Sequence, residues 1–175
     1  ELIEKYGADA TRFGMIYQNL GNQDIRFNED AMLTGKKFCN KIWNASRFVL
    51  QNANSEKNTK YQILDTKYYT EADKKILNGL GKTGEEIEKR IEKYEFGQAL
   101  HKLYDFFWHE YADIYIETAK LQMADEKIKI STQNILLKIH LDLLKLLHPF
   151  LPFITEEIWS AFGKKNLLLI EKWPK

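Results

Sequence analysis

The chain has 175 residues, 44% of them hydrophobic and 29% charged, which suits one globular domain and excludes a disordered or low-complexity chain. Its 26 basic and 25 acidic residues leave a formal net charge of +1, so any nucleic-acid site must be a local patch. A single cysteine, Cys39, excludes an internal disulfide, and no apolar run is long enough to span a membrane.

The first half of the chain predicts two helices joined by a loop. The spacing predicts a helix over residues 9–19, with Asp9 at its N-cap. Asn28, followed by two acidic residues, predicts the start of a longer helix over residues 28–53. The polar stretch 54–69 is expected to be a connecting loop. Apolar residues recur at helical spacing within the longer helix and predict its buried face: Phe38, Ile42, Ala45 and Val49.

The middle of the chain predicts two further long helices. Thr70 and Asp73 have the spacing of a capping box and predict the start of the first. Three glycines between residues 79 and 84 weaken this helix, so a kink or break is expected there. Residues 96–121 form the most aromatic segment, which is expected to be the central and most buried helix.

The last part of the chain predicts two helices on either side of a proline corner. Ser131 or Thr132 is expected to cap a helix that ends at Pro149. A short helix then begins near Pro152 and ends before Gly163. No segment alternates convincingly enough to be a strand, so the predicted fold class is all-α, an antiparallel helix bundle.

No motif in the sequence predicts catalysis. There is no glycine-rich phosphate loop. His109 and Glu110 begin a possible zinc motif, but Asp113 stands where the second histidine of H-E-x-x-H would be. Two possible ligands without a third make a poor metal site, so we expect no catalytic residue and no metal site in this chain.

One polar face of the helix over residues 28–53 is the candidate binding site. Amide and basic side chains beside an aromatic ring suit unstacked RNA bases, which stack on the ring and hydrogen-bond through their edges. The alternative is an ordinary solvated face with Phe48 folded into the core, and helical spacing alone favours that alternative. At about 100° per residue, the polar side chains that gather beside the buried face are Asn40, Lys41, Asn44, Arg47 and Gln51, with Phe48 at their edge.

Several sequence segments carry a family resemblance. They are K-Y-G-A-D-A-T-R-F at residues 5–13, K-I-W-N-A-S-R-F-V-L at 41–50, E-K-Y-E-F-G-Q-A-L at 92–100 and H-P-F-L-P-F-I-T-E-E-I-W at 148–159. Together they resemble the anticodon-binding domain of class I aminoacyl-tRNA synthetases. The last segment is shared widely among valyl, isoleucyl and leucyl members. N-Q-D-I-R-F at residues 22–27, taken with the segment 41–50, is similar to the valyl branch.

The resemblance implies a single anticodon-binding domain over residues 1–175, cut from a longer protein. Residues 1–27 would connect to a catalytic domain of the same chain, 28–163 would form the helix bundle, and 164–175 would lead to a further C-terminal region. The full-length valine–tRNA ligase would use ATP with magnesium to attach valine to tRNA(Val). The HIGH-type and KMSKS-type motifs of that reaction do not occur here, so this chain would be non-catalytic and hold no cofactor.

The resemblance also implies a partner and the residues that meet it. The partner would be the anticodon loop of tRNA(Val), bound by a cytoplasmic, monomeric enzyme that has no membrane partner. Phe48 would stack on a base, while Arg47 and Lys41 would contact base edges or phosphates. Asn40 and Asn44 are added only from their place on the polar face. Two alternatives stay open: the same domain of an isoleucyl- or leucyl-tRNA synthetase, and a helical scaffold that makes only protein–protein contacts.

Overall fold

The fold consists of helices packed side by side. The computed structural model describes residues 1–21, 27–52 and 66–174, and no strand occurs among those residues. The α-helices are α1 Leu2–Tyr6, α2 Ala8–Tyr17, α3 Asp30–Asn52, α4 Glu71–Glu92, α5 Phe96–Asp105, α6 Ile116–Gln122, α7 Lys129–Leu147 and α8 Pro152–Ala161. The π-helix η2 Phe106–Tyr115 joins α5 to α6, and the 3-10 turns are η1 Thr66–Tyr68 and η3 Leu168–Ile170.

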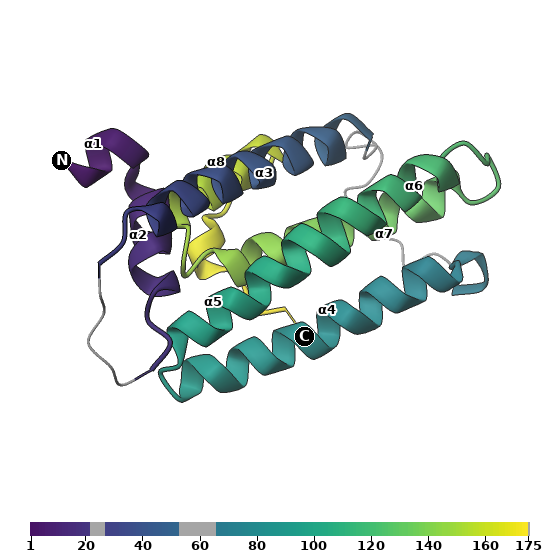
Figure 1. Ribbon diagram of the computed structural model, residues 1–175. Helices are drawn as coiled ribbons and strands as arrows, with labels where there is room; N and C mark the ends of the chain where they lie inside the picture. The colour runs from purple at the N-terminus through teal and green to yellow at the C-terminus, as the bar shows by residue number, and fades with distance from the viewer. Residues whose placement is uncertain (22–26, 53–65, 175) are drawn as a thin grey trace.

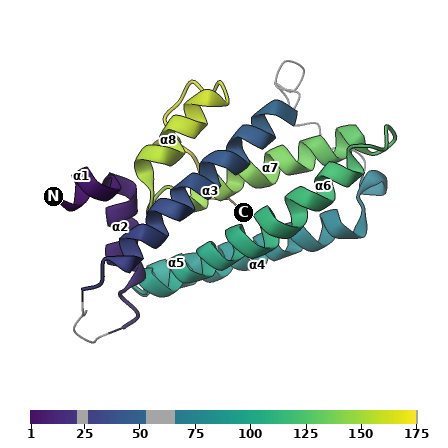
Figure 2. The ribbon, with the colours of Figure 1, turned by 45° about the horizontal axis from the view of Figure 1, so that its top comes forward.

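Figure 1 shows that α5, η2 and α6 form one long rod through the middle of the molecule. Helix α4 runs antiparallel along one side of this rod, and α3 lies along the other side. Helix α7 runs antiparallel behind it, and α8 crosses beyond α3, as the turned view of Figure 2 also shows. The predicted all-α antiparallel bundle is therefore confirmed.

The π-helix keeps the aromatic side chains of the central rod on one face. Buried residues occur there as neighbouring pairs: Phe106 with Phe107, Tyr111 with Ala112, and Tyr115 with Ile116. These pairs recur every four or five residues, which matches the wide turn of a π-helix better than the 3.6 residues of an α-helix turn. The opposite face, which includes His109 and Asp113, stays exposed beside α3.

Helix α7, and not the aromatic rod, is the most buried helix among those described. Twelve of its side chains are buried, on all sides of the helix. The prediction for residues 96–121 was wrong on this point, because η2 and α6 still expose one side to solvent. An apolar pattern around the whole circumference, as in α7, is the sign of a helix surrounded by others.

The predictions of where helices begin and end were confirmed in part. The capping box of Thr70 and Asp73 starts α4, Asn28 accepts the backbone N–H of Asp30 at the start of α3 (2.9 Å), and Pro152 is the first residue of α8. Helix α4 runs unbroken through its three glycines, so the expected kink or break was wrong. Of the expected loop over residues 54–69, residues 54–65 lie outside the described residues.

Two predicted caps were wrong, because Asp9 bonds to another helix and because Ser131 and Thr132 lie within α7 and not at its N-cap. Asp9 does not cap its own helix; its carboxylate accepts the backbone N–H groups of Phe153 (3.3 Å) and Ile154 (2.6 Å), in the first turn of α8. Ser131 and Thr132 lie inside α7, and the Thr132 hydroxyl donates to Gln122 at 3.2 Å. None of the described helices is both long enough and apolar enough to cross a membrane.

Candidate nucleic-acid interface

One face of α3 is buried in the bundle and the other faces solvent. The apolar stripe predicted from the sequence is buried as expected, and it rests against the rod and α7. Here, the outward face of α3 means the exposed residues of this helix in its middle and last turns. They are Lys36, Lys37, Asn40, Trp43, Asn44, Arg47 and Gln51.

The cations and amides on this outward face are available to a partner. Asn40, Asn44 and Arg47 are exposed on successive turns, as their spacing predicted. Among the described residues, no carboxylate lies within ion-pair distance of Lys36, Lys37 or Arg47. Positive charge therefore lies at both ends of the outward face, although the net charge of the whole chain is only +1.

Lys41 differs from its predicted neighbours because it is engaged with the central rod. Its Nζ lies 2.6 Å from Oδ1 of Asp113 in η2 and 5.3 Å from the centre of the Trp108 ring. The second carboxylate oxygen of Asp113 lies 3.8 Å from Nδ1 of His109. Lys41 thus links α3 to η2 and is not a free cation.

Phe48 lies at the same seam, two turns further along α3. Its ring is half-buried and packs against the core. Nζ of Lys120 in α6 lies 5.2 Å from the ring centre, and Glu117 holds that ammonium group at 2.6 Å. A base that stacks on Phe48 would therefore have to share the ring with Lys120 or displace it.

Trp43 is an aromatic side chain on the outward face that sequence reasoning missed. Its side chain is 42% exposed, and it lies on the edge of this face away from the rod. The available signal was a tryptophan one helical turn from both Asn40 and Arg47 and directly before Asn44. A large exposed ring beside amides and cations is a suitable stacking platform for a base.

A series of buried hydrogen bonds fixes the rotation of α3 about its own axis. The Ser46 hydroxyl donates to the carbonyl of Ile42 (2.7 Å), so Nε2–H of His140 must donate to Ser46 Oγ (2.9 Å). Nδ1 of His140 then accepts from the hydroxyl of Tyr111 at 3.0 Å. Burial lowers the pKa of His140 to about 3, so the ring stays neutral and this direction of donation is kept. Ser46 directly precedes Arg47, so these hydrogen bonds position the turn of α3 that carries Arg47.

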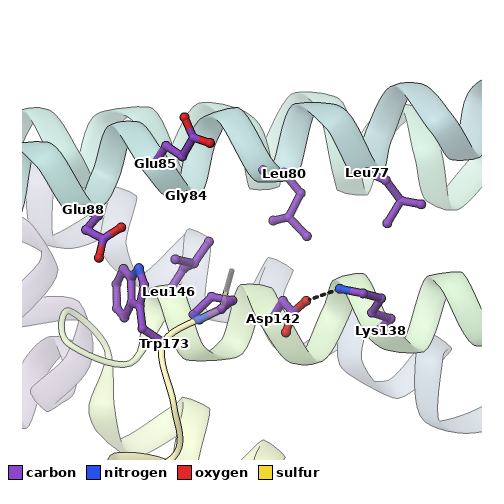
Figure 3. A pocket seen from close by; sticks show the side chains of 11 residues that line it. Leu77, Leu80, Gly84, Glu85, Glu88, Lys138, Asp142, Leu146 and Trp173 are labelled. Atoms are coloured by element: carbon purple, nitrogen blue, oxygen red, sulfur yellow. Dashed lines mark hydrogen bonds and ion pairs between the residues drawn. The ribbon is translucent and has the colours of Figure 1, made fainter. Parts of the chain in front are cut away.

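Several cavities among the described residues are lined by helices other than α3. One groove of about 390 Å³ lies between α4 and α7, and Figure 3 shows Trp173 of the C-terminal tail covering one end of it. Its polar side chains include Glu85, Glu88 and the ion pair of Lys138 with Asp142 at 2.7 Å. Within the described part of the chain, no three histidine, cysteine or acidic side chains gather as metal ligands.

Comparison with known proteins places this fold in a family. The family model for the anticodon-binding domain of tRNA ligase matches residues 73–175, a range that leaves out α3. The LeuRS of Agrobacterium radiobacter, solved as a ternary complex with tRNA and LeuAMS, superposes with a TM-score of 0.76 over 99% of this chain and 20% of its own. Its sequence identity is 20%, so this likeness concerns the fold.

Curated relatives match the chain from end to end. The valine–tRNA ligase of Clostridium tetani is 45% identical over 100% of this chain, and that of Bacillus cereus is 43% identical over 99%. The valine–tRNA ligase of Pseudothermotoga lettingae is 42% identical over 100%. In each case the chain spans 20% of the relative's length. The chain belongs to the family of anticodon-binding domains of tRNA ligases.

Proposed function

We propose that this chain is the anticodon-binding domain of a valine–tRNA ligase and that it binds the anticodon loop of tRNA(Val) on the outward face of α3. The family supports an anticodon-binding role, and the three relatives named above support valine as the amino acid. The observation that carries the choice of surface is the row of exposed amides and cations on a helix whose other face is fixed in the core.

The side chains of this surface would make different contacts with RNA, according to their chemistry. Arg47, Asn40 and Asn44 would hydrogen-bond base edges, because their donors and acceptors are exposed and lie on successive turns. Trp43 supplies the most open aromatic ring of the outward face, and Phe48 would stack a base at the seam with α6.

Phosphate contacts would fall to the free lysines. Lys36 and Lys37 are exposed in the first half of α3 and would meet the RNA backbone. Lys41 stays a candidate contact, but its ion pair with Asp113 supports a role in shaping the surface rather than in binding phosphate. Paired charges add little to the attraction of a distant polyanion.

The activity of the whole enzyme is part of the same proposal. A full-length valine–tRNA ligase of the cytoplasm would use ATP with magnesium at a catalytic domain outside this chain. Residues 1–27 would lead from that domain and 164–175 toward a C-terminal region, with a monomer as the expected state. Exposed apolar side chains near both ends support contacts with further domains, among them Ile3, Met15, Leu167 and Leu169.

Binding of anticodon stem-loop RNAs tests the proposal. The chain is expected to bind a stem-loop that carries a valine anticodon more tightly than one that carries an isoleucine anticodon, with affinity that falls as salt rises. Replacing Trp43 with alanine is expected to weaken binding about five-fold or more, since stacking contributes roughly 1–3 kcal/mol per base. Equal affinity for the two RNAs would refute the valine assignment, and crosslinks only outside α3 would refute the surface.

A further inference from the structure

Asp113 places a carboxylate at the edge of the proposed RNA surface. It lies on the exposed side of η2, and its side chain is 43% exposed. Oδ1 is held by Lys41 of α3 at 2.6 Å, whereas Oδ2 accepts no hydrogen bond from the described residues and has only the 3.8 Å approach of His109. One oxygen is thus anchored and the other remains available.

The anchoring makes this carboxylate a fixed feature of the surface. Lys41 is held by Trp108 as well as by Asp113, and η2 is held by the buried rings of Tyr111 and Tyr115 on either side of Asp113. A short aspartate side chain on such a helix has little freedom to turn away. Its position beside a surface for RNA would be unfavourable if it faced a phosphate, because like charges repel.

An ionised carboxylate only accepts hydrogen bonds, so it can distinguish bases by their exocyclic groups. Valine and isoleucine anticodons both have adenine in the middle and differ in the last base, which is cytosine for valine and uracil for isoleucine. Cytosine presents an amino donor at the position where uracil presents a carbonyl acceptor. Aspartate and glutamate are suited to accept from that amino group of cytosine.

We propose that Asp113 is a specificity-determining residue, whose Oδ2 accepts a hydrogen bond from the exocyclic amino group of the last anticodon base. Uracil at that position would place its carbonyl oxygen against the carboxylate and be rejected. Lys41 is the positioning partner that turns Oδ2 toward the base. The inference rests on the proposed function, since it names the base contact that separates valine from isoleucine on the same surface.

The test compares two stem-loop RNAs that differ only in cytosine or uracil at the last anticodon position. For the natural chain, the cytosine RNA is expected to bind on the order of ten-fold more tightly than the uracil RNA. Asp113→Asn, which keeps the shape and adds a donor, is expected to reduce this ratio to about two-fold or less. The affinity for the cytosine RNA is expected to fall and that for the uracil RNA to rise, because the variant weakens the acceptor and removes the repulsion of the uracil carbonyl.

Glu71→Gln is the matched control, because Glu71 is also an exposed carboxylate that pairs with a lysine, Lys74 at 2.8 Å, and it lies on α4 outside the proposed surface. It is expected to leave the cytosine-to-uracil ratio unchanged. A ratio that stays at the natural value in Asp113→Asn overturns the inference while leaving the proposed function intact. A natural chain with no preference overturns the valine assignment itself. Circular dichroism of each variant confirms that the helices are retained.

Discussion

His140 lies completely buried where α3, η2 and α7 meet, and it is neutral because burial lowers its pKa to about 3. In the unfolded chain a histidine binds a proton near pH 6.5. Between these two values the unfolded state holds one more proton than the folded state. The free energy of unfolding therefore falls as pH falls below about 6.5, by about 1.4 kcal/mol per pH unit from this residue.

His140→Gln is expected to remove this part of the pH dependence, because glutamine does not titrate. Urea unfolding at about pH 7 and about pH 5 measures it for both proteins. The natural chain should lose about 2 kcal/mol more than the variant between the two conditions. Parallel losses in the two proteins would contradict a buried neutral histidine at this position.

Gly97 and Gly81 are helix glycines in opposite surroundings. A side-chain carbon at Gly97 would overlap the carbonyl of Asn19, where α5 docks against the end of α2. At Gly81 in α4 it would meet nothing within 4 Å. Gly97→Ala is therefore expected to lower the free energy of unfolding by about 1–3 kcal/mol or more, and Gly81→Ala to raise it by about 0.5–1 kcal/mol. Urea midpoints that move together would contradict this packing.

At the scale of the element, the start of α4 depends on the rod as well as on its own sequence. Asp73 is fully buried; one of its oxygens accepts the Thr70 backbone N–H at 2.8 Å and the other accepts the Tyr115 hydroxyl at 2.8 Å. Gln122 also donates to Thr70, at 2.6 Å. The cap of α4 is thereby tied to η2 and α6, which hold the face beside α3.

Thr70→Ala is expected to cost about 1 kcal/mol of stability, the usual cost of losing an N-cap side chain. Asp73→Ala should cost more, because it also leaves the buried Tyr115 hydroxyl without its acceptor, a penalty of about 1–3 kcal/mol. Adding Tyr115→Phe to Asp73→Ala should restore part of that loss. A double-mutant cycle from urea unfolding measures the coupling, and strictly additive losses would show that the two side chains do not interact.

At the scale of the whole molecule, charge is nearly balanced overall, and exposed lysines lie on both sides of the central rod. Lys36 and Lys37 lie on α3, whereas Lys75 and Lys82 lie on α4, on the other side of the rod in Figure 1. Replacing both α3 lysines with glutamine is expected to reduce the slope of log affinity against log salt by about 0.7 for each phosphate that the protein no longer neutralises.

The same replacement at Lys75 and Lys82 changes the net charge equally and serves as the control for that experiment. Its slope for stem-loop binding should match the natural chain, because only phosphates that meet a protein cation release counterions. If both double variants showed the same reduced slope, the attraction would come from net charge and not from the outward face of α3.

Local patterns determined much of what could be predicted. The capping box at Thr70, the first position of α8 at Pro152 and the buried stripe of α3 all depend on residues within one or two helical turns. The exposure of Asn40, Asn44 and Arg47 follows from the same periodicity, because a helix that buries one stripe must expose the other.

The sequence by itself thus determined an all-helical domain of a recognisable family and the helix face on which to look for RNA binding. Only the tertiary structure decided which side chains of that face pair with other helices and which remain exposed to a partner. Asp9 caps α8, Lys41 pairs with Asp113, and Ser46 meets His140, in each case across many positions in the chain. Such partners depend on how whole helices pack, and helical spacing within one segment carries no information about the side chains of another.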